Sequence, residues 1–189
     1  MKKITFPAVM IGTAIICGIL TAAFAFAYHL TNAGWLLSLA ITAGTICYHF
    51  AMRLVVGSLV PNTFDYRSRW FQPRAFEAAL YKKLRLKGWK DKMPTYDPRL
   101  FSLQHNTLAQ IVQNICQAEV VHETIMALSF VPMVFSLVWD SFWVFTLTSL
   151  AAACFDGLFV MLQRYNRPRL IRLLEKQRKK GCAYDPTTH

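Results

Sequence analysis

Three ionisable side chains lie close together in the chain, directly before a long apolar run. Glu119 and Glu123 are four residues apart with His122 between them, so a helix places all three near one another. A histidine paired with a carboxylate can act as a general base, because the carboxylate fixes the tautomer and supports the imidazolium. The run at residues 124–135 is apolar enough to lie in the hydrocarbon core of a bilayer. Ionisable groups at membrane depth are functional-site candidates.

Two other interpretations of this cluster stay open. Glu119 and His122 have the Glu-x-x-His spacing of a metal-ligand pair, but no second pair appears, so we expect no metal site. The cluster could instead be structural, a helix end whose carboxylates pair with arginines on the inner side of the membrane. In each interpretation, Glu123 is the outer member of the cluster.

A second set of polar residues lies in the other apolar segments. His49 and Arg53 are four residues apart near the end of the second segment, and Asp156 lies within the fourth. A carboxylate at this depth needs a partner, and either His122 or Arg53 would serve. The simpler interpretations are that His49 packs in the core and that Arg53 extends to the lipid headgroups.

The fourth apolar segment is followed by a basic stretch. Residues 163–170 hold three arginines, an asparagine and a proline, which predicts a rigid turn rich in hydrogen-bond donors. Arginine side chains suit phosphate or carboxylate groups. The candidate binding residues here are Gln163, Arg164, Asn166, Arg167 and Arg169.

We expect the helices that position these residues to form an all-α membrane protein, with four transmembrane helices in two pairs. Of the 189 residues, 54% are hydrophobic and only 16% are charged, and a bilayer-spanning helix needs about 20 apolar residues. The predicted helices cover residues 4–28, 33–60, 107–139 and 142–163, in a single membrane domain. Pro132 predicts a kink or break in the third. Nothing resembles a nucleic-acid-binding motif.

The basic residues predict the orientation of the four helices. All 21 lie at residues 2–3, at Arg53, in the loop 61–106 or in the tail 164–189. The short connections at residues 31–34 and 140–141 hold none, so both termini and the loop are expected in the cytoplasm of a multi-pass cell-membrane protein. The N-terminus imitates a signal peptide ending near Ala27, but its apolar run is long enough to favour a retained helix.

The loop between the two helical pairs predicts an amphipathic helix near residues 74–86. Phe76, Leu80 and Leu84 form its apolar stripe, and a glycine at position 88 ends it. Such a helix suits the membrane interface or packing on the cytoplasmic helix ends. The five cysteines form no framework and are expected to be small buried hydrophobic residues.

The stretch Gln-Arg-Tyr-Asn-Arg-Pro-Arg at 163–169, with Glu119–His122 upstream and Trp89-Lys90-Asp91-Lys92 between the helical pairs, resembles the glycosyl-4,4′-diaponeurosporenoate acyltransferases. The resemblance covers about residues 64–181. It implies transfer of a fatty acyl group to the C6 hydroxyl of a glucose esterified to a C30 carotenoid acid, as in staphyloxanthin-type synthesis.

The same resemblance implies roles for the candidate residues. His122 would take the proton of the sugar hydroxyl, and Glu119 would orient the imidazole of His122. Asn166 or Gln163 would stabilise the oxyanion. Arg164, Arg167 and Arg169 would bind donor phosphate. The other expected substrate-binding residues are His49, Arg53, Trp89, Lys90 and Asp156.

The expected partners follow from the same chemistry. They are a glycosyl carotenoid or other membrane-lipid acceptor, an acyl-CoA or acyl carrier protein donor, and anionic lipids attracted by the net charge of +11. The acyl thioester is a co-substrate, and no cofactor is expected. A homo-oligomer is compatible with the pattern. The competing hypotheses are a transferase acting on another lipid or glycolipid and a non-catalytic scaffold of a pigment-synthesis complex.

Overall fold

The computed structural model describes residues 6–93, 97–139 and 141–182, and every regular element in these ranges is helical. Lys2 and Lys3, Asp140 of the second short connection and residues 183–189 of the tail lie outside the described residues. The described residues form two compact units. The first falls within residues 6–60 and 121–158, and the second within residues 61–120 and 159–182.

Four long helices account for most of the chain. They are α1 (Phe6–Thr31), α2 (Gly34–Leu59), α5 (Leu108–Leu128) and α7 (Phe142–Cys182). The segments long and apolar enough to cross a membrane are Ala8–Thr31, Gly34–Leu59, Leu108–Trp139 and Phe142–Lys179. The prediction of a multi-pass, all-α membrane protein is therefore confirmed.

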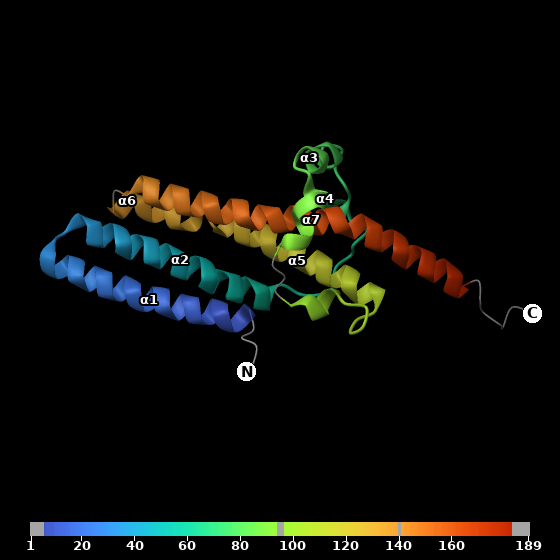
Figure 1. Ribbon diagram of the computed structural model, residues 1–189, viewed down its shortest axis with the longest axis horizontal. Helices are drawn as coiled ribbons and strands as arrows, with labels where there is room; N and C mark the ends of the chain where they lie inside the picture. The colour runs from blue at the N-terminus through green and yellow to red at the C-terminus, as the bar shows by residue number, and fades with distance from the viewer. Residues whose placement is uncertain (1–5, 94–96, 140, 183–189) are drawn as a thin grey trace, which may run out of the picture. The chain divides into compact units, whose positions relative to one another are not determined.

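In the first unit, α1 and α2 form a closely packed antiparallel hairpin (Figure 1). Small residues let the helices approach: a Cβ at Gly18 would lie 3.6 Å from Cys47 Sγ, and one at Gly44 would lie 3.3 Å from Thr21 Cγ2. Asn32 turns the chain between them with a φ of 52°. Most of the outer α1 surface is apolar and exposed, as a lipid-facing helix requires.

The C-terminal part of α5 packs on α2 in the same unit. Met52, Val56 and Ile125 form a buried apolar cluster. The Tyr48 hydroxyl donates a 3.0 Å hydrogen bond to the carbonyl of Leu128, where α5 ends. Because a helix C-terminus leaves carbonyls without partners, this bond anchors the end of α5.

The third predicted span is interrupted where Pro132 occurs. After α5, the chain forms the 3-10 helix η4 (Val131–Phe135) and then the short helix α6 (Ser136–Trp139). Proline has no backbone N–H and cannot continue the hydrogen-bond ladder of an α-helix. The predicted break is confirmed.

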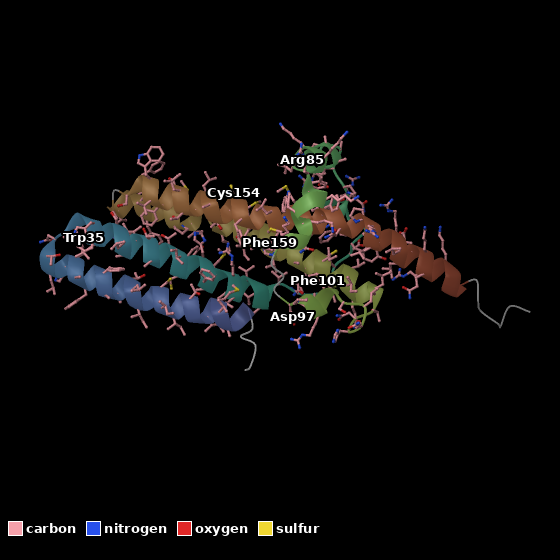
Figure 2. The ribbon with its side chains drawn as sticks, in the orientation of Figure 1. Trp35, Arg85, Asp97, Phe101, Cys154 and Phe159 are labelled. Atoms are coloured by element: carbon pink, nitrogen blue, oxygen red, sulfur yellow. The ribbon has the colours of Figure 1, made fainter. Side chains whose placement is uncertain are left out.

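In the second unit, the predicted amphipathic helix is divided in two. Helices α3 (Glu77–Lys83) and α4 (Leu86–Trp89) are separated by Arg85, labelled in Figure 2, whose φ is 49°. The predicted helix end at Gly88 was wrong, because Gly88 lies inside α4. Phe76 of the predicted apolar stripe lies just before α3 and is 59% exposed, whereas Glu77 is 5% exposed. The polar Glu77 is buried because it has an ionic partner, which helical periodicity alone does not reveal.

Shorter 3-10 helices complete the unit. They are η1 (Arg69–Phe71), η2 (Lys90–Lys92) and η3 (Pro98–Phe101). Asp97, labelled in Figure 2, caps η3 by accepting a hydrogen bond from the backbone N–H of Arg99.

The predicted end of the fourth helix at residue 163 was wrong, and so was the turn at residues 163–170. Helix α7 continues to Cys182 with Pro168 in its interior. Val160, Gln163, Arg167 and Leu174 are all at most 9% exposed. Their spacing gives the helix one buried face that extends beyond the apolar segment, so packing within the second unit replaces lipid as its support.

Candidate functional site

The first unit contains a buried carboxylate with two ionic partners, which we call the Asp156 cluster: Arg53, His122 and Asp156. Asp156 is fully buried on α7. Its Oδ1 lies 2.9 Å from Nδ1 of His122 on α5, and its Oδ2 is ion-paired with Nη2 of Arg53 on α2. Three helices therefore bring their polar residues to one point, and both partners predicted for Asp156 are present.

This geometry determines which imidazole nitrogen can act as a base. A carboxylate at Nδ1 favours the tautomer that carries its proton there, so the lone pair of a neutral His122 lies on Nε2. Arg53 keeps Asp156 paired, which a charge buried in an apolar helix bundle requires. The His122 side chain is 23% exposed whereas that of Asp156 is 0% exposed. The histidine is thus the most accessible member of the cluster, since the Arg53 side chain is 15% exposed.

His49 lies one helical turn before Arg53 on α2. Its residue is 6% exposed, and neither ring nitrogen has a hydrogen-bond partner in the part of the chain that the structure describes. Its backbone carbonyl accepts a 2.9 Å hydrogen bond from Nη1 of Arg53. An unsatisfied buried polar side chain costs about 1–3 kcal/mol, so a functional reason for its retention is worth testing.

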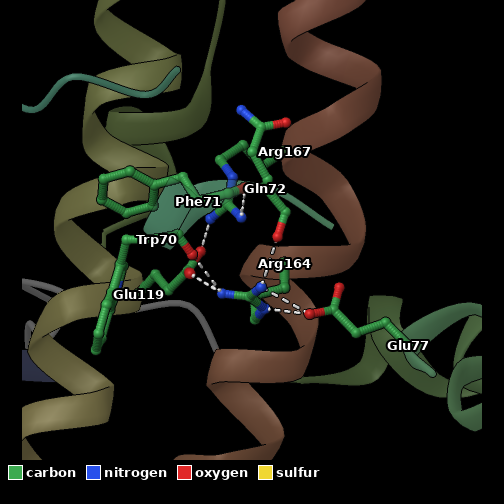
Figure 3. A network of polar contacts seen from close by, with 7 residues as sticks. All are labelled: Trp70, Phe71, Gln72, Glu77, Glu119, Arg164 and Arg167. Atoms are coloured by element: carbon green, nitrogen blue, oxygen red, sulfur yellow. Dashed lines mark hydrogen bonds and ion pairs between the residues drawn. The ribbon is translucent and has the colours of Figure 1, made fainter. Parts of the chain in front are cut away.

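The second unit contains a separate polar network, the carboxylate–arginine cluster of Glu77, Glu119, Arg164 and Arg167 (Figure 3). Glu119 on α5 is fully buried, and its Oε1 accepts a 2.7 Å hydrogen bond from Nη1 of Arg164. Its Oε2 is ion-paired with Nη1 of Arg167. Glu77 at the start of α3 accepts a 2.7 Å hydrogen bond from Nε of Arg164.

The same arginines hold the backbone that precedes α3, as Figure 3 shows. Arg164 donates to the carbonyls of Trp70 at 3.2 Å and Gln72 at 3.0 Å. Arg167 donates to the carbonyl of Phe71, and its guanidinium lies 5.0 Å from the centre of the Phe71 ring. Their contacts are thus with protein groups, which makes the cluster a brace between helix α7 and residues 70–72.

A tyrosine extends this network. Tyr81 on α3 hydrogen-bonds to Glu77, and its ring packs edge-on against Tyr165 with centroids 5.6 Å apart. Burial and the nearby Glu77 carboxylate raise the pKa of Tyr81 to about 12. The hydroxyl therefore stays protonated and keeps its hydrogen bond to Glu77.

The other predicted site residues have varied environments. Glu123 and Asn166 are partly buried, Gln163 is buried and Arg169 is exposed. Trp89 donates from Nε1 to the Leu84 carbonyl at 2.9 Å, and Lys90 begins η2. Among the described residues, no group of three or more His, Cys, Asp or Glu side chains could hold a metal ion.

Sequence reasoning missed Glu77 and the carbonyls of residues 70–72. Glu77 occurs 87 positions before its partner Arg164, so no local spacing connects them. One available signal was its position three residues before Leu80 on the apolar stripe of the predicted helix. Residue type gives no sign of which backbone carbonyls accept hydrogen bonds from the arginines.

The comparison with protein families assigns this arrangement to a known group. The family model for glycosyl-4,4′-diaponeurosporenoate acyltransferase matches residues 67–176, more than half of the chain. This range includes the whole carboxylate–arginine cluster, together with His122 and Asp156, but not His49 and Arg53. No curated protein and no solved structure matches the chain. The chain therefore belongs to the glycosyl-4,4′-diaponeurosporenoate acyltransferase family and is an acyltransferase of carotenoid biosynthesis.

Proposed function

We propose that this protein esterifies the C6 hydroxyl of the glucose of glycosyl-4,4′-diaponeurosporenoate with a fatty acyl group from a cytoplasmic thioester. The family match supports acyl transfer, and the Nδ1 contact between His122 and Asp156 is the observation that carries the mechanism. The acceptor has a long apolar tail that suits the bilayer, which agrees with a site between membrane-spanning helices.

In this mechanism, His122 is the general base. Its Nε2 takes the proton of the sugar hydroxyl as the hydroxyl oxygen attacks the thioester carbonyl carbon. The tetrahedral intermediate collapses with cleavage of the C–S bond, and the imidazolium returns the proton to the departing thiolate. One ester and one thiol are formed from one alcohol and one thioester, so no further reactant is needed.

Asp156 is the positioning residue in this proposal, and Arg53 holds Asp156. The geometry supports Asp156 in place of Glu119 as the carboxylate that orients His122, because Glu119 is ion-paired with Arg164 and Arg167 in the second unit. Asn166 or Gln163 as the donor to the oxyanion stays a prediction from the sequence.

The test is turnover by the purified protein in nanodiscs with an acyl thioester and the glycosyl carotenoid. We expect a product heavier by one acyl group, with fragments that place the ester on the C6 oxygen. His122→Ala should lower turnover about 10²–10⁴-fold, the usual cost of losing a general base. Parallel assays with acyl-CoA and acyl carrier protein identify the donor, and other glycolipids test the acceptor.

A matched control separates catalysis from insertion. Glu123→Gln changes a neighbouring polar residue on α5 and should retain most of the turnover, with the same yield of folded protein. Near-normal turnover by His122→Ala would overturn the mechanism. Acylation of another glycolipid in preference to the carotenoid would instead correct the acceptor.

A further inference from the structure

A cavity of about 230 Å³ lies within the second unit, between residues 66–73 and residues 167–175 of helix α7. It is lined by Tyr66, Arg67, Phe71, Gln72, Pro73, Arg167, Pro168, Ile171, Arg172 and Glu175. Complete small-molecule sites commonly measure about 300–1,000 Å³, so this cavity suits one end of a larger ligand.

Two arginines in the cavity lining have no anionic partner among the described residues, although the Arg67 guanidinium lies 5.8 Å from the centre of the Tyr66 ring. Arg67 and Arg172 are exposed, and neither forms an ion pair with any residue that the structure describes. Arg172 donates from Nε to the Pro168 carbonyl at 3.2 Å, which leaves its terminal nitrogens for a ligand. Arg167 differs, since it is buried and neutralised by Glu119.

The rest of the lining combines one acidic group with apolar surface. Glu175 offsets one of these two positive charges, so the cavity retains a positive balance. Phe71, Pro73, Pro168 and Ile171 provide the apolar surface. A ligand that fits has an anionic group for the arginines and carbon atoms beside it.

We propose that this cavity binds a phosphate group joined to a carbon chain, with Arg67 and Arg172 as its ligands. Guanidinium groups bind phosphate oxygens through charge-assisted hydrogen bonds. Given the proposed function, on which this identification rests, the phosphate belongs to the phosphopantetheine of the acyl donor. An anionic phospholipid headgroup has the same chemistry and is the other source. Arg164 and Arg167 have a different task, since their donors bind Glu119 and the backbone of residues 70–72.

The test compares two probes that differ by one phosphate. Calorimetry on the protein in phosphatidylcholine nanodiscs measures the binding of 4′-phosphopantetheine and of pantetheine. We expect tighter binding of the phosphorylated probe, and a loss of about 10-fold or more for that probe in Arg67→Gln and Arg172→Gln. Lys176→Gln is the matched control: this exposed lysine lies one turn beyond Arg172 on α7 and outside the cavity lining, so binding should stay within about 2-fold.

A second arm distinguishes the lipid source. Native mass spectrometry counts phosphatidylglycerol molecules retained by the wild type and the two arginine variants. A variant-dependent loss of retained lipid, with no preference for 4′-phosphopantetheine, supports the phosphate site and assigns it to the headgroup. Equal binding of both pantetheine probes, together with unchanged lipid retention, overturns the site.

The binding test of the phosphate site and the test of the His122 mechanism can fail separately. His122→Ala should retain 4′-phosphopantetheine binding while its turnover falls. If it retains both, the mechanism fails and the phosphate site stands. If it loses only turnover while the arginine variants bind normally, the mechanism stands and the phosphate site fails.

Discussion

At the scale of single residues, the position of one carboxylate decides the chemistry assigned to His122. The three candidate residues near this histidine are Glu119, Glu123 and Asp156, and Asp156 is the one whose oxygen lies 2.9 Å from Nδ1. This contact selects Nε2 as the basic nitrogen. It also makes Asp156, 34 positions away in sequence, the residue to alter when the tautomer is tested.

Asp156→Asn should lower kcat about 10²–10⁴-fold with little change in the KM of either substrate. An amide can donate to Nδ1 and thereby stabilise the wrong imidazole tautomer, as removal of the orienting carboxylate does in other acyl-transfer enzymes. Steady-state kinetics on protein with wild-type helicity provides the measurement. If Asp156→Asn has normal kcat, Asp156 serves the fold rather than the tautomer.

His49→Leu is expected to stabilise the protein and to weaken its activity. Replacing a buried imidazole that lacks hydrogen-bond partners with an apolar side chain removes a cost of about 1–3 kcal/mol. A rise in Tm with a fall in turnover identifies His49 as a group that meets the substrate. A rise in Tm with full turnover would show that it has no such role, and His49→Gln should restore part of any lost activity.

At the scale of elements, α7 joins two tasks that the sequence predicts for separate segments. Its first half supplies Asp156 to the first unit, and its second half supplies Arg164 and Arg167 to the second. The carboxylate–arginine cluster connects α5, α7 and the start of α3 within the second unit. Removal of one member leaves a charge buried without full compensation.

Glu119→Gln should therefore destabilise the second unit by about 3–5 kcal/mol, the usual effect of breaking a buried ion pair. Limited proteolysis should cut residues 61–76 sooner than in the wild type, and the yield of folded protein should fall. Asp97→Asn is the control, because it removes an ion pair with an Arg99 side chain that is 72% exposed and should change little. Unchanged stability with lost turnover would instead restore the role in orienting His122 that the sequence suggested for Glu119.

At the scale of the whole molecule, the charge distribution predicts which side of the membrane each connection faces. Connections between α1 and α2 and between the third and fourth spans hold no lysine or arginine, while the loop 61–106 holds ten. The positive-inside rule predicts that this loop and both termini face the cytoplasm. This topology would also put a thioester donor and the arginine-lined cavity on the same side.

Membrane-impermeant thiol labelling of intact cells tests this orientation. In a background without the native cysteines, a cysteine at Asn32 or Ser141 should react from outside, and Cys182 restored alone should react only after the membrane is permeabilised. The reverse pattern would place the basic segments outside, and the donor would then have to be an extracellular compound.

The sequence alone was sufficient for the features that depend on local composition. Four apolar runs predicted four spans, Pro132 predicted the end of an α-helix, and the cost of a buried carboxylate predicted a partner for Asp156. The motif at 163–169 pointed to the family that the comparison shows. Such features can be predicted from the sequence because hydrophobicity, backbone geometry and desolvation act on each segment wherever it lies in the fold.

Only the tertiary structure decided which charges Glu119 and Glu77 meet. Glu119 has the correct spacing to face His122, yet it is ion-paired with Arg164 and Arg167, which occur about 45 positions later. Glu77 and the carbonyls of residues 70–72 join the same arginines across more than 80 positions. Helix α7 continues past residue 163 because these long-range contacts and the packing of Leu174 support it. Pairings of this kind depend on how helices are brought together, and periodicity within one helix contains no information about them.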